Sequence, residues 1–146
     1  MNFDLWQKIV DEAAGLSLIS LLTITGLGEP LLDKDLKQKL KYARSKMPAI
    51  PISLFTNGSY LRKHLPLLKK YNVTTYVSLN AANSYKREQI MELDDYDEVV
   101  SASEQGIKDG VEIIVKAVCE KDLMEGEETV QFIVDWNGRH AEGGNA

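Results

Sequence analysis

The sequence has few of the residues that most metal and redox sites require. Its 146 residues include a single cysteine, Cys119, and two histidines, His64 and His140. One thiol cannot form an intrachain disulfide, and it cannot hold a zinc ion or an iron–sulfur cluster, because those sites need several thiolate or imidazole ligands. Two histidines also form no paired-histidine motif or Ser–His–Asp arrangement here. We therefore expect no metal centre built by this chain alone.

Basic charge and long apolar segments are also scarce. The formal net charge is -5, and binding to a phosphate backbone depends largely on Lys and Arg, so we expect no nucleic-acid partner. The lysine-rich segment 34–46 is typical of a solvated helix face.

No apolar run approaches the ~20 residues that span a bilayer, and the N-terminus does not resemble a signal peptide. We expect a cytoplasmic protein with no membrane partner, and an unpaired cysteine fits a reducing compartment.

Strand-like and helix-like patterns alternate along the chain. A hydrophobic content of 44% over 146 residues suffices for one compact domain with a core. Such alternation is typical of a parallel sheet with crossover helices. Strands are predicted over residues 18–25, 52–56, 73–79 and 111–118. Helices are predicted from the cap Asn2 to the stop Gly15, along the apolar stripe Leu36–Met47, over Leu61–Leu68 and from Asp97 to Gly110.

Residues 129–137 fit two patterns. Val130, Phe132, Val134 and Trp136 alternate as in a strand, whereas Val130, Ile133 and Val134 also form a helical stripe. We favour the helix, because acidic residues would occupy its first turn and basic residues its last turn. A strand here would also follow the preceding one too closely for a crossover helix. The predicted fold class is α/β, with a parallel sheet of about four βα units.

Small and polar residues follow each predicted strand. The segments are Gly26-Leu-Gly-Glu-Pro30, Thr56-Asn-Gly58, Ser78-Leu-Asn80 and Val118-Cys-Glu120. In a parallel βα array the carboxyl ends of the strands lie together, and their loops build a single site. The spacing therefore predicts one ligand site formed by all four segments.

Together these segments resemble motifs of the radical S-adenosylmethionine (SAM) superfamily, specifically of the middle of its partial βα barrel. Gly26-Leu-Gly-Glu-Pro-Leu-Leu32 resembles the second-strand motif, Phe55-Thr-Asn-Gly58 the third and Val77-Ser-Leu-Asn80 the fourth. The similarity extends over nearly the whole chain. It implies a partial TIM barrel that binds SAM. In complete enzymes of this family, electron transfer from a 4Fe-4S cluster cleaves SAM to a 5'-deoxyadenosyl radical.

The resemblance also implies roles for individual residues. The carboxylate of Glu29 and the neighbouring backbone would hold the ammonium group of SAM, Ser78 would meet the ribose, and Val118 would lie near the adenine. These roles agree with the chemistry of SAM, since an ammonium requires acceptors, a ribose requires polar partners and an adenine requires an apolar wall. The residues expected to bind the cofactor are Gly26, Gly28, Glu29, Pro30, Thr56, Asn57, Ser78, Asn80 and Val118.

The cysteine content departs from the family pattern. The family holds its cluster with a Cys-x3-Cys-x2-Cys loop after the first strand, and this chain begins at what resembles the following helix. We therefore expect residues 1–146 to be a single partial βα-barrel domain, truncated at one or both ends. The resemblance implies a SAM-binding core that is not catalytically competent alone. Open sheet edges would favour self-association or pairing with a complementing chain.

The same features also have structural interpretations. Glu29 is suited to begin a helix, Asn57-Gly58 is a common turn pair, and Ser78 and Asn80 can simply end a strand. At the level of function, one alternative is a non-catalytic α/β binding or scaffold module. Another alternative is an unrelated α/β enzyme that acts on a small phosphorylated or acidic metabolite.

Overall fold

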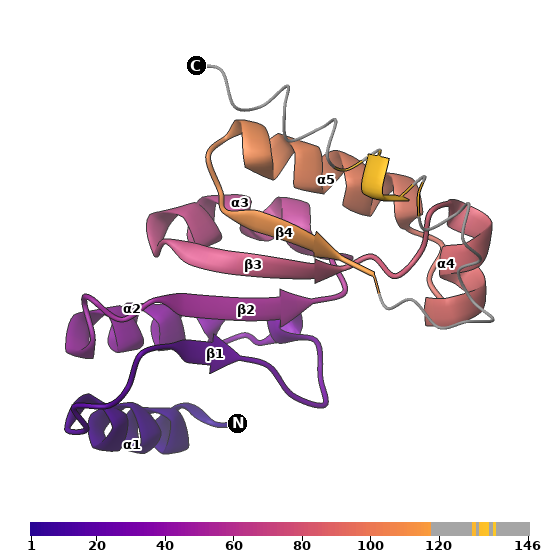
Figure 1. Ribbon diagram of the computed structural model, residues 1–146. Coiled ribbons are helices and arrows are strands. Elements are labelled where there is room, and N and C mark those ends of the chain that lie inside the picture. Colours follow the sequence, from indigo (N-terminus) through magenta and orange to yellow (C-terminus); the bar gives the residue numbers. More distant parts are fainter. Residues whose placement is uncertain (118–129, 131, 135, 137–146) are drawn as a thin grey trace.

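The computed structural model of this chain describes residues 1–117, 130, 132–134 and 136. Helices and strands alternate along it, as Figure 1 shows. The helices are α1 (Phe3–Ala14), the short 3-10 helix η1 (Pro30–Leu32), α2 (Leu36–Lys46), α3 (Leu61–Lys70), α4 (Ser84–Met91) and α5 (Tyr96–Lys108). The strands are β1 (Leu22–Ile24), β2 (Ile52–Thr56), β3 (Val73–Ser78) and β4 (Ile113–Lys116).

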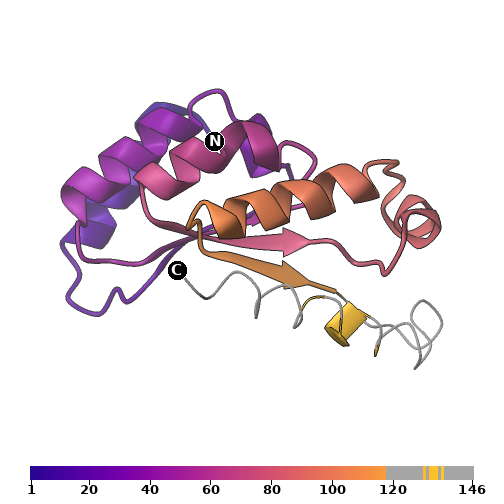
Figure 2. The same ribbon diagram turned by 90° about the horizontal axis from the view of Figure 1, so that it is seen from above.

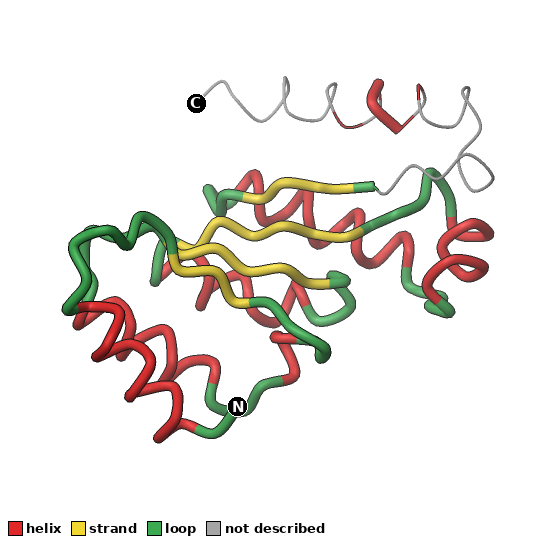
Figure 3. Tube along the Cα trace, turned by 60° about the horizontal axis from the view of Figure 1, so that its bottom comes forward, coloured by secondary structure: helices red, strands yellow, loops and turns green. Residues whose placement is uncertain are grey.

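The four strands form one parallel sheet, in the order β1-β2-β3-β4. Their register places Ile52 opposite Leu22 on one side and opposite Val73 on the other. Parallel neighbours need crossover connections, and the helices between the strands supply them. Figure 3 shows the strands side by side with the loops at their ends. The predicted α/β fold with a four-stranded parallel sheet is confirmed.

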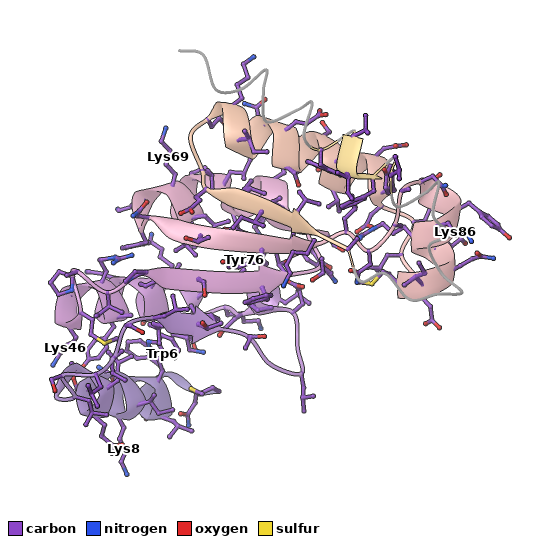
Figure 4. The ribbon with its side chains drawn as sticks, in the orientation of Figure 1. Trp6, Lys8, Lys46, Lys69, Tyr76 and Lys86 are labelled. Carbon is purple, nitrogen blue, oxygen red and sulfur yellow. The ribbon has the colours of Figure 1, made fainter. Side chains whose placement is uncertain are left out.

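The core lies between the helices and one face of the sheet. Helices α2, α3 and α5 are on that face, as Figure 2 shows. The strand residues that point toward them are mostly apolar, among them the buried Leu54, Val77 and Ile113, and include the buried Thr75. Because side chains alternate along a strand, the residues next to these point to the opposite face. Tyr76 lies on this opposite face, turned away from the helices (Figure 4).

Helices α1 and α2 follow the predicted patterns. Asn2 caps α1, because its Oδ1 accepts a hydrogen bond of 3.0 Å from the backbone N–H of Leu5, and Gly15 follows the last helical residue. Asp35 precedes α2 without a side-chain cap bond, and Asp33 Oδ1 instead accepts from the Asp35 N–H at 2.9 Å. The predicted stripe of α2 is buried at all of its positions, which are Leu36, Leu40, Ala43 and Met47.

Two predicted strands are shorter in the structure. The segment 18–25 contains only the three residues of β1, and Leu18 is 92% exposed. β1 pairs with β2 on one side, and in the described part of the chain no strand pairs with its other edge. Residues before Leu22 therefore lack a strand partner for their backbone groups. β4 likewise occupies only part of the predicted segment 111–118.

The C-terminal segment is helical where the structure describes it. Residues 130, 132–134 and 136 are helical, which confirms the helix over the strand at these positions. Trp136 is buried in the core, and Phe132 packs against the core. The predicted strand-end segment 118–120, with Val118 and Cys119, lies outside the described residues. No described helix has both the length and the apolar character needed to cross a bilayer.

Candidate functional site

The carboxylate of Glu29 lies where the ends of β1 and β2 meet. Glu29 is the N-cap of η1, and its Oε1 accepts a hydrogen bond of 3.1 Å from the backbone N–H of Leu31. The same oxygen accepts from the hydroxyl of Thr56 at 2.5 Å, and Oε2 accepts from the N–H of Asn57 at 2.9 Å. A carboxylate offers about four acceptor sites, so these donors orient the group and still leave it able to accept another. Glu29 therefore caps η1 and also presents a fixed anion.

The Thr56-Asn-Gly58 turn holds this carboxylate through its hydroxyl and backbone. Thr56 Oγ1 accepts from the N–H of Gly58 at 3.0 Å while its own hydroxyl donates to Glu29. The Asn57 side chain accepts from the N–H of Ser59 at 3.0 Å, which is a turn-forming bond. Gly58 has φ +88°, and a Cβ there would lie 2.6 Å from Val99 Cγ1. Only glycine therefore fits the turn that aims Thr56 and Asn57 at Glu29.

A buried arginine, which sequence reasoning missed, joins the ends of β2 and β3. Arg87 has 0% exposed surface. Its guanidinium donates to the carbonyl oxygens of Asn57 at 2.8 Å, Leu79 at 3.0 Å and Ser78 at 3.3 Å. It also donates to the carboxylate of Asp95 at 2.5 Å. No apolar stripe runs along α4 to mark Arg87 as buried, so the sequence offered no signal for this contact.

Asp95 is the counterion of Arg87 and is itself held by a second donor. The hydroxyl of Ser59 donates to its other carboxylate oxygen. Partial burial tends to raise the pKa of Asp95, but the hydrogen bonds from Arg87 and Ser59 and the charge of Arg87 outweigh burial and lower that pKa. The carboxylate is thus ionised at neutral pH, and the ion pair anchors the strand ends.

A pocket of about 560 Å³ is lined by β1 and the turn that follows it, together with residues of α1 and α2. Residues 23–30 form much of its wall, so Gly26, Gly28, Glu29 and Pro30 all line it. A Cβ placed on either of the two glycines would meet nothing within 4 Å, which means that their backbone faces open space. The volume is within the range of small-molecule sites.

An ion pair between α2 and the preceding turn closes part of the pocket wall. Lys39 is 4% exposed, and its Nζ lies 2.5 Å from Asp33 Oδ2 and 2.6 Å from the carbonyl oxygen of Met1. Partial burial tends to raise the pKa of Asp33, but hydrogen bonds from Lys39 and the Asp35 N–H lower it overall. The prediction of a solvated face over residues 34–46 is wrong at Lys39. This residue lies on the same helical face as Leu36 and Leu40, a signal that the periodicity contained.

Of the other predicted site residues that the structure describes, none lines this pocket. Ser78 ends β3, and Asn80 has φ +56°, with its amide 3.3 Å from the sulfur of Met91. Neither residue lines the pocket beside β1. The structure therefore brings Glu29, Thr56 and Asn57 together, and it connects them to Ser78 through Arg87. Val118 is not among the described residues.

The motifs and the sheet agree with a comparison against protein families. The family model described as Radical SAM superfamily matches residues 2–133. The chain belongs to the radical SAM superfamily. The match includes all four strands and the Glu29 and Thr56-Asn-Gly58 segments, and the parallel sheet corresponds to a partial radical SAM βα barrel.

A curated relative has a longer chain. It is the GTP 3',8-cyclase of Nautilia profundicola (strain ATCC BAA-1463 / DSM 18972 / AmH), and it is 26% identical to this chain over 126 residues. The aligned part covers 86% of this chain and 38% of that protein. This chain therefore spans well under half the length of the relative.

The radical SAM family implies SAM and a 4Fe-4S cluster as cofactors. The residues present fit SAM, because Glu29 offers an oriented anion beside an open glycine backbone. They do not fit the cluster, which requires several thiolates, since the sequence has one cysteine. Within the described ranges, no three His, Cys, Asp or Glu side chains are grouped to hold a metal ion.

Proposed function

We propose that this chain is the SAM-binding core of a radical SAM enzyme and that Glu29 receives the ammonium group of SAM. The observation that supports the proposal is the orientation of the Glu29 carboxylate by Thr56 and Asn57. A carboxylate fixed before the ligand arrives loses little conformational freedom on binding, so more of the interaction appears as affinity. A charge-assisted hydrogen bond to an ammonium is also stronger than a neutral one.

The remaining roles follow the order of the strand ends. In this proposal Gly26, Gly28 and Pro30 shape the backbone around the amino-acid part of SAM. Ser78 and Asn80 face the ribose, and Val118 lies beside the adenine. The half-buried side chains of Ser78 and Asn80 support this assignment, because they keep polar groups near the strand end without full exposure.

The proposal does not make this chain an active enzyme on its own. The sequence lacks the three thiolates that the family's cluster needs, so a complementing chain or segment would have to supply them. Among the described residues no strand pairs with the other edge of β1, and this edge offers backbone groups to such a partner or to a second copy. The domain assignment, residues 1–146 as a truncated partial barrel, is part of this proposal.

Titration calorimetry with S-adenosylhomocysteine tests the proposal without the cluster. We expect saturable binding, and we expect Glu29→Gln to weaken it about tenfold or more, because a hydrogen bond to a charged group contributes about 1.5–3 kcal/mol. Thr56→Val should weaken binding less, since it removes only one donor that orients the carboxylate. Glu12→Gln, an exposed acid on α1, is the matched control and should leave binding unchanged.

Thermal unfolding of each variant separates lost binding from lost folding. If folded wild-type protein shows no binding, the SAM proposal fails and the non-catalytic α/β scaffold becomes the better interpretation. That alternative rests on the missing cluster ligands. If Glu29→Gln and Glu12→Gln lower affinity equally, the assignment of Glu29 is wrong.

A further inference from the structure

Two aromatic rings are stacked on the sheet face that points away from the helices. Phe55 of β2 and Tyr76 of β3 lie directly opposite each other in the register. Their ring centroids are 4.6 Å apart and the ring planes differ by 11°. Both side chains are half-buried, although the face they occupy is opposite to α2, α3 and α5. Core packing against those helices therefore does not explain the pair.

The ammonium group of Lys116 lies next to both rings. Its Nζ is 5.0 Å from the centroid of Phe55 and 5.5 Å from that of Tyr76, within the distance of a cation–π interaction. Lys116 is exposed, and no described carboxylate forms an ion pair with it. We refer to Phe55, Tyr76 and Lys116 as the aromatic–lysine cluster. It combines two stacked aromatic rings with a cation that has no carboxylate partner among the described residues.

The cluster lies near the carboxyl ends of the strands. Phe55 immediately precedes Thr56, whose hydroxyl holds Glu29. Lys116 is opposite Ser78 in the register. Glu112, which precedes β4 at the other end of that strand, accepts a hydrogen bond from the hydroxyl of Thr74 at 2.7 Å. The cation is therefore at the same end of the sheet as the proposed SAM site, whereas Glu112 is at the other end.

We propose that the aromatic–lysine cluster binds the substrate of this site and that the substrate is a planar aromatic or heteroaromatic ring bearing a carboxylate or phosphate. This inference rests on the proposed function, because it takes the ligand to be the molecule that lies beside SAM. Aromatic rings attract a further ring in offset or edge-on arrangements. The Lys116 ammonium pairs with the anionic group by a charge-assisted hydrogen bond. Neither a neutral ring nor an aliphatic anion satisfies both parts of the cluster.

Titration of isotope-labelled protein with 2-naphthoate, followed by NMR, tests the inference. We expect saturable shift changes centred on Phe55, Tyr76 and Lys116. The uncharged 2-naphthol and the non-aromatic cyclohexanecarboxylate should each bind about tenfold more weakly or worse, since each lacks one of the two interactions. Equal binding of 2-naphthoate and either comparison compound overturns the inference, as does a shift pattern centred elsewhere. Absence of 2-naphthoate binding also overturns it.

Variants assign the binding to the cluster itself. Lys116→Gln should weaken 2-naphthoate binding about tenfold, whereas Lys8→Gln on the exposed side of α1 should not change it. Tyr76→Leu should weaken binding about fivefold, and Tyr76→Phe should restore it because the ring is retained. A fold defect would lower binding in both Tyr76 variants, so rescue by phenylalanine separates ring contact from stability.

A parallel titration with S-adenosylhomocysteine separates this inference from the proposed function. If S-adenosylhomocysteine binds in a Glu29-dependent way and 2-naphthoate does not bind, the inference fails and the SAM proposal stands. If 2-naphthoate binds through Lys116 and S-adenosylhomocysteine does not bind, the cluster is a ligand site but not a substrate site beside SAM. That result overturns both the inference and the proposed function. Binding of both probes, each with its own variant dependence, supports both.

Discussion

Replacement of Arg87 by methionine should destabilise the fold more than any surface change. Arg87 is fully buried and donates to three backbone carbonyls and to Asp95. Methionine has a similar length but no donor, so the substitution leaves these acceptors unpaired. Removing one partner of a buried ion pair costs about 3–5 kcal/mol. Since small domains are stable by about 5–15 kcal/mol, this is a large share of the total.

Urea unfolding followed by circular dichroism measures this loss. Arg62→Met is the matched control, because Arg62 forms an exposed pair with Glu98 and such pairs contribute little. We expect a lower midpoint for Arg87→Met with an unchanged slope, and almost no change for Arg62→Met. A loss below about 1 kcal/mol for Arg87→Met would mean that the guanidinium does not anchor the strand ends as argued.

The same variant should alter how stability depends on pH. The pKa of Asp95 is lowered in the folded protein, so its contribution to stability is present above the unfolded value of ~3.9 and is lost as pH falls through the folded pKa. Wild-type protein should therefore lose stability below about pH 4, and Arg87→Met should lose less over that window because its Asp95 is no longer paired. Parallel curves for the two proteins would show that Asp95 is not coupled to Arg87.

Three further predictions concern packing, cofactor and assembly. Gly58→Ala and Gly106→Ala should each lower the free energy of unfolding by about 1–3 kcal/mol in the same urea assay. A Cβ on Gly58 would lie 2.6 Å from Val99, and a Cβ on Gly106 would lie 2.3 Å from Ile113. Gly15→Ala is the control and should be nearly neutral, because its Cβ would make an ordinary contact of 3.5 Å. Anaerobic reconstitution followed by iron and sulfide analysis should find no stoichiometric cluster, since the sequence has one cysteine, and a bound cluster would refute this account. Size-exclusion chromatography at increasing concentration should show self-association through open sheet edges, and a stable monomer throughout would count against it.

The fold was largely predictable because local patterns and tertiary structure agree. Apolar spacing on α2 identified the buried face correctly, and the run Ile52–Thr56 matches β2 at both ends. The predicted strand lengths were wrong where pairing with a neighbouring strand decides how long a strand is. The segment 18–25 is apolar enough to be a strand, but only three of its residues have a neighbouring strand. Periodicity reports which residues favour a strand, whereas strand length depends on partners elsewhere in the chain.

The site was only partly predictable, because its motifs are held by hydrogen bonds between residues that are distant in the sequence. Glu29 and Thr56 could be named from their places at strand ends, but their hydrogen bond could not. Arg87 and Asp95 lie eight positions apart in polar surroundings, where sequence gives no sign of burial. Lys39 is different, since its helical spacing from Leu36 already placed it on the buried face of α2.

The contacts among these residues form one continuous series from β1 to β3. Glu29 is held by Thr56 and Asn57, the carbonyl of Asn57 is held by Arg87, and Arg87 also holds the carbonyl of Ser78. Each strand-end motif is therefore positioned by the next, which explains why these motifs occur together in one chain even though only the Glu29 segment lines the pocket. It follows that a change at Arg87 should weaken S-adenosylhomocysteine binding through Asn57 and Glu29, without any contact between Arg87 and the ligand.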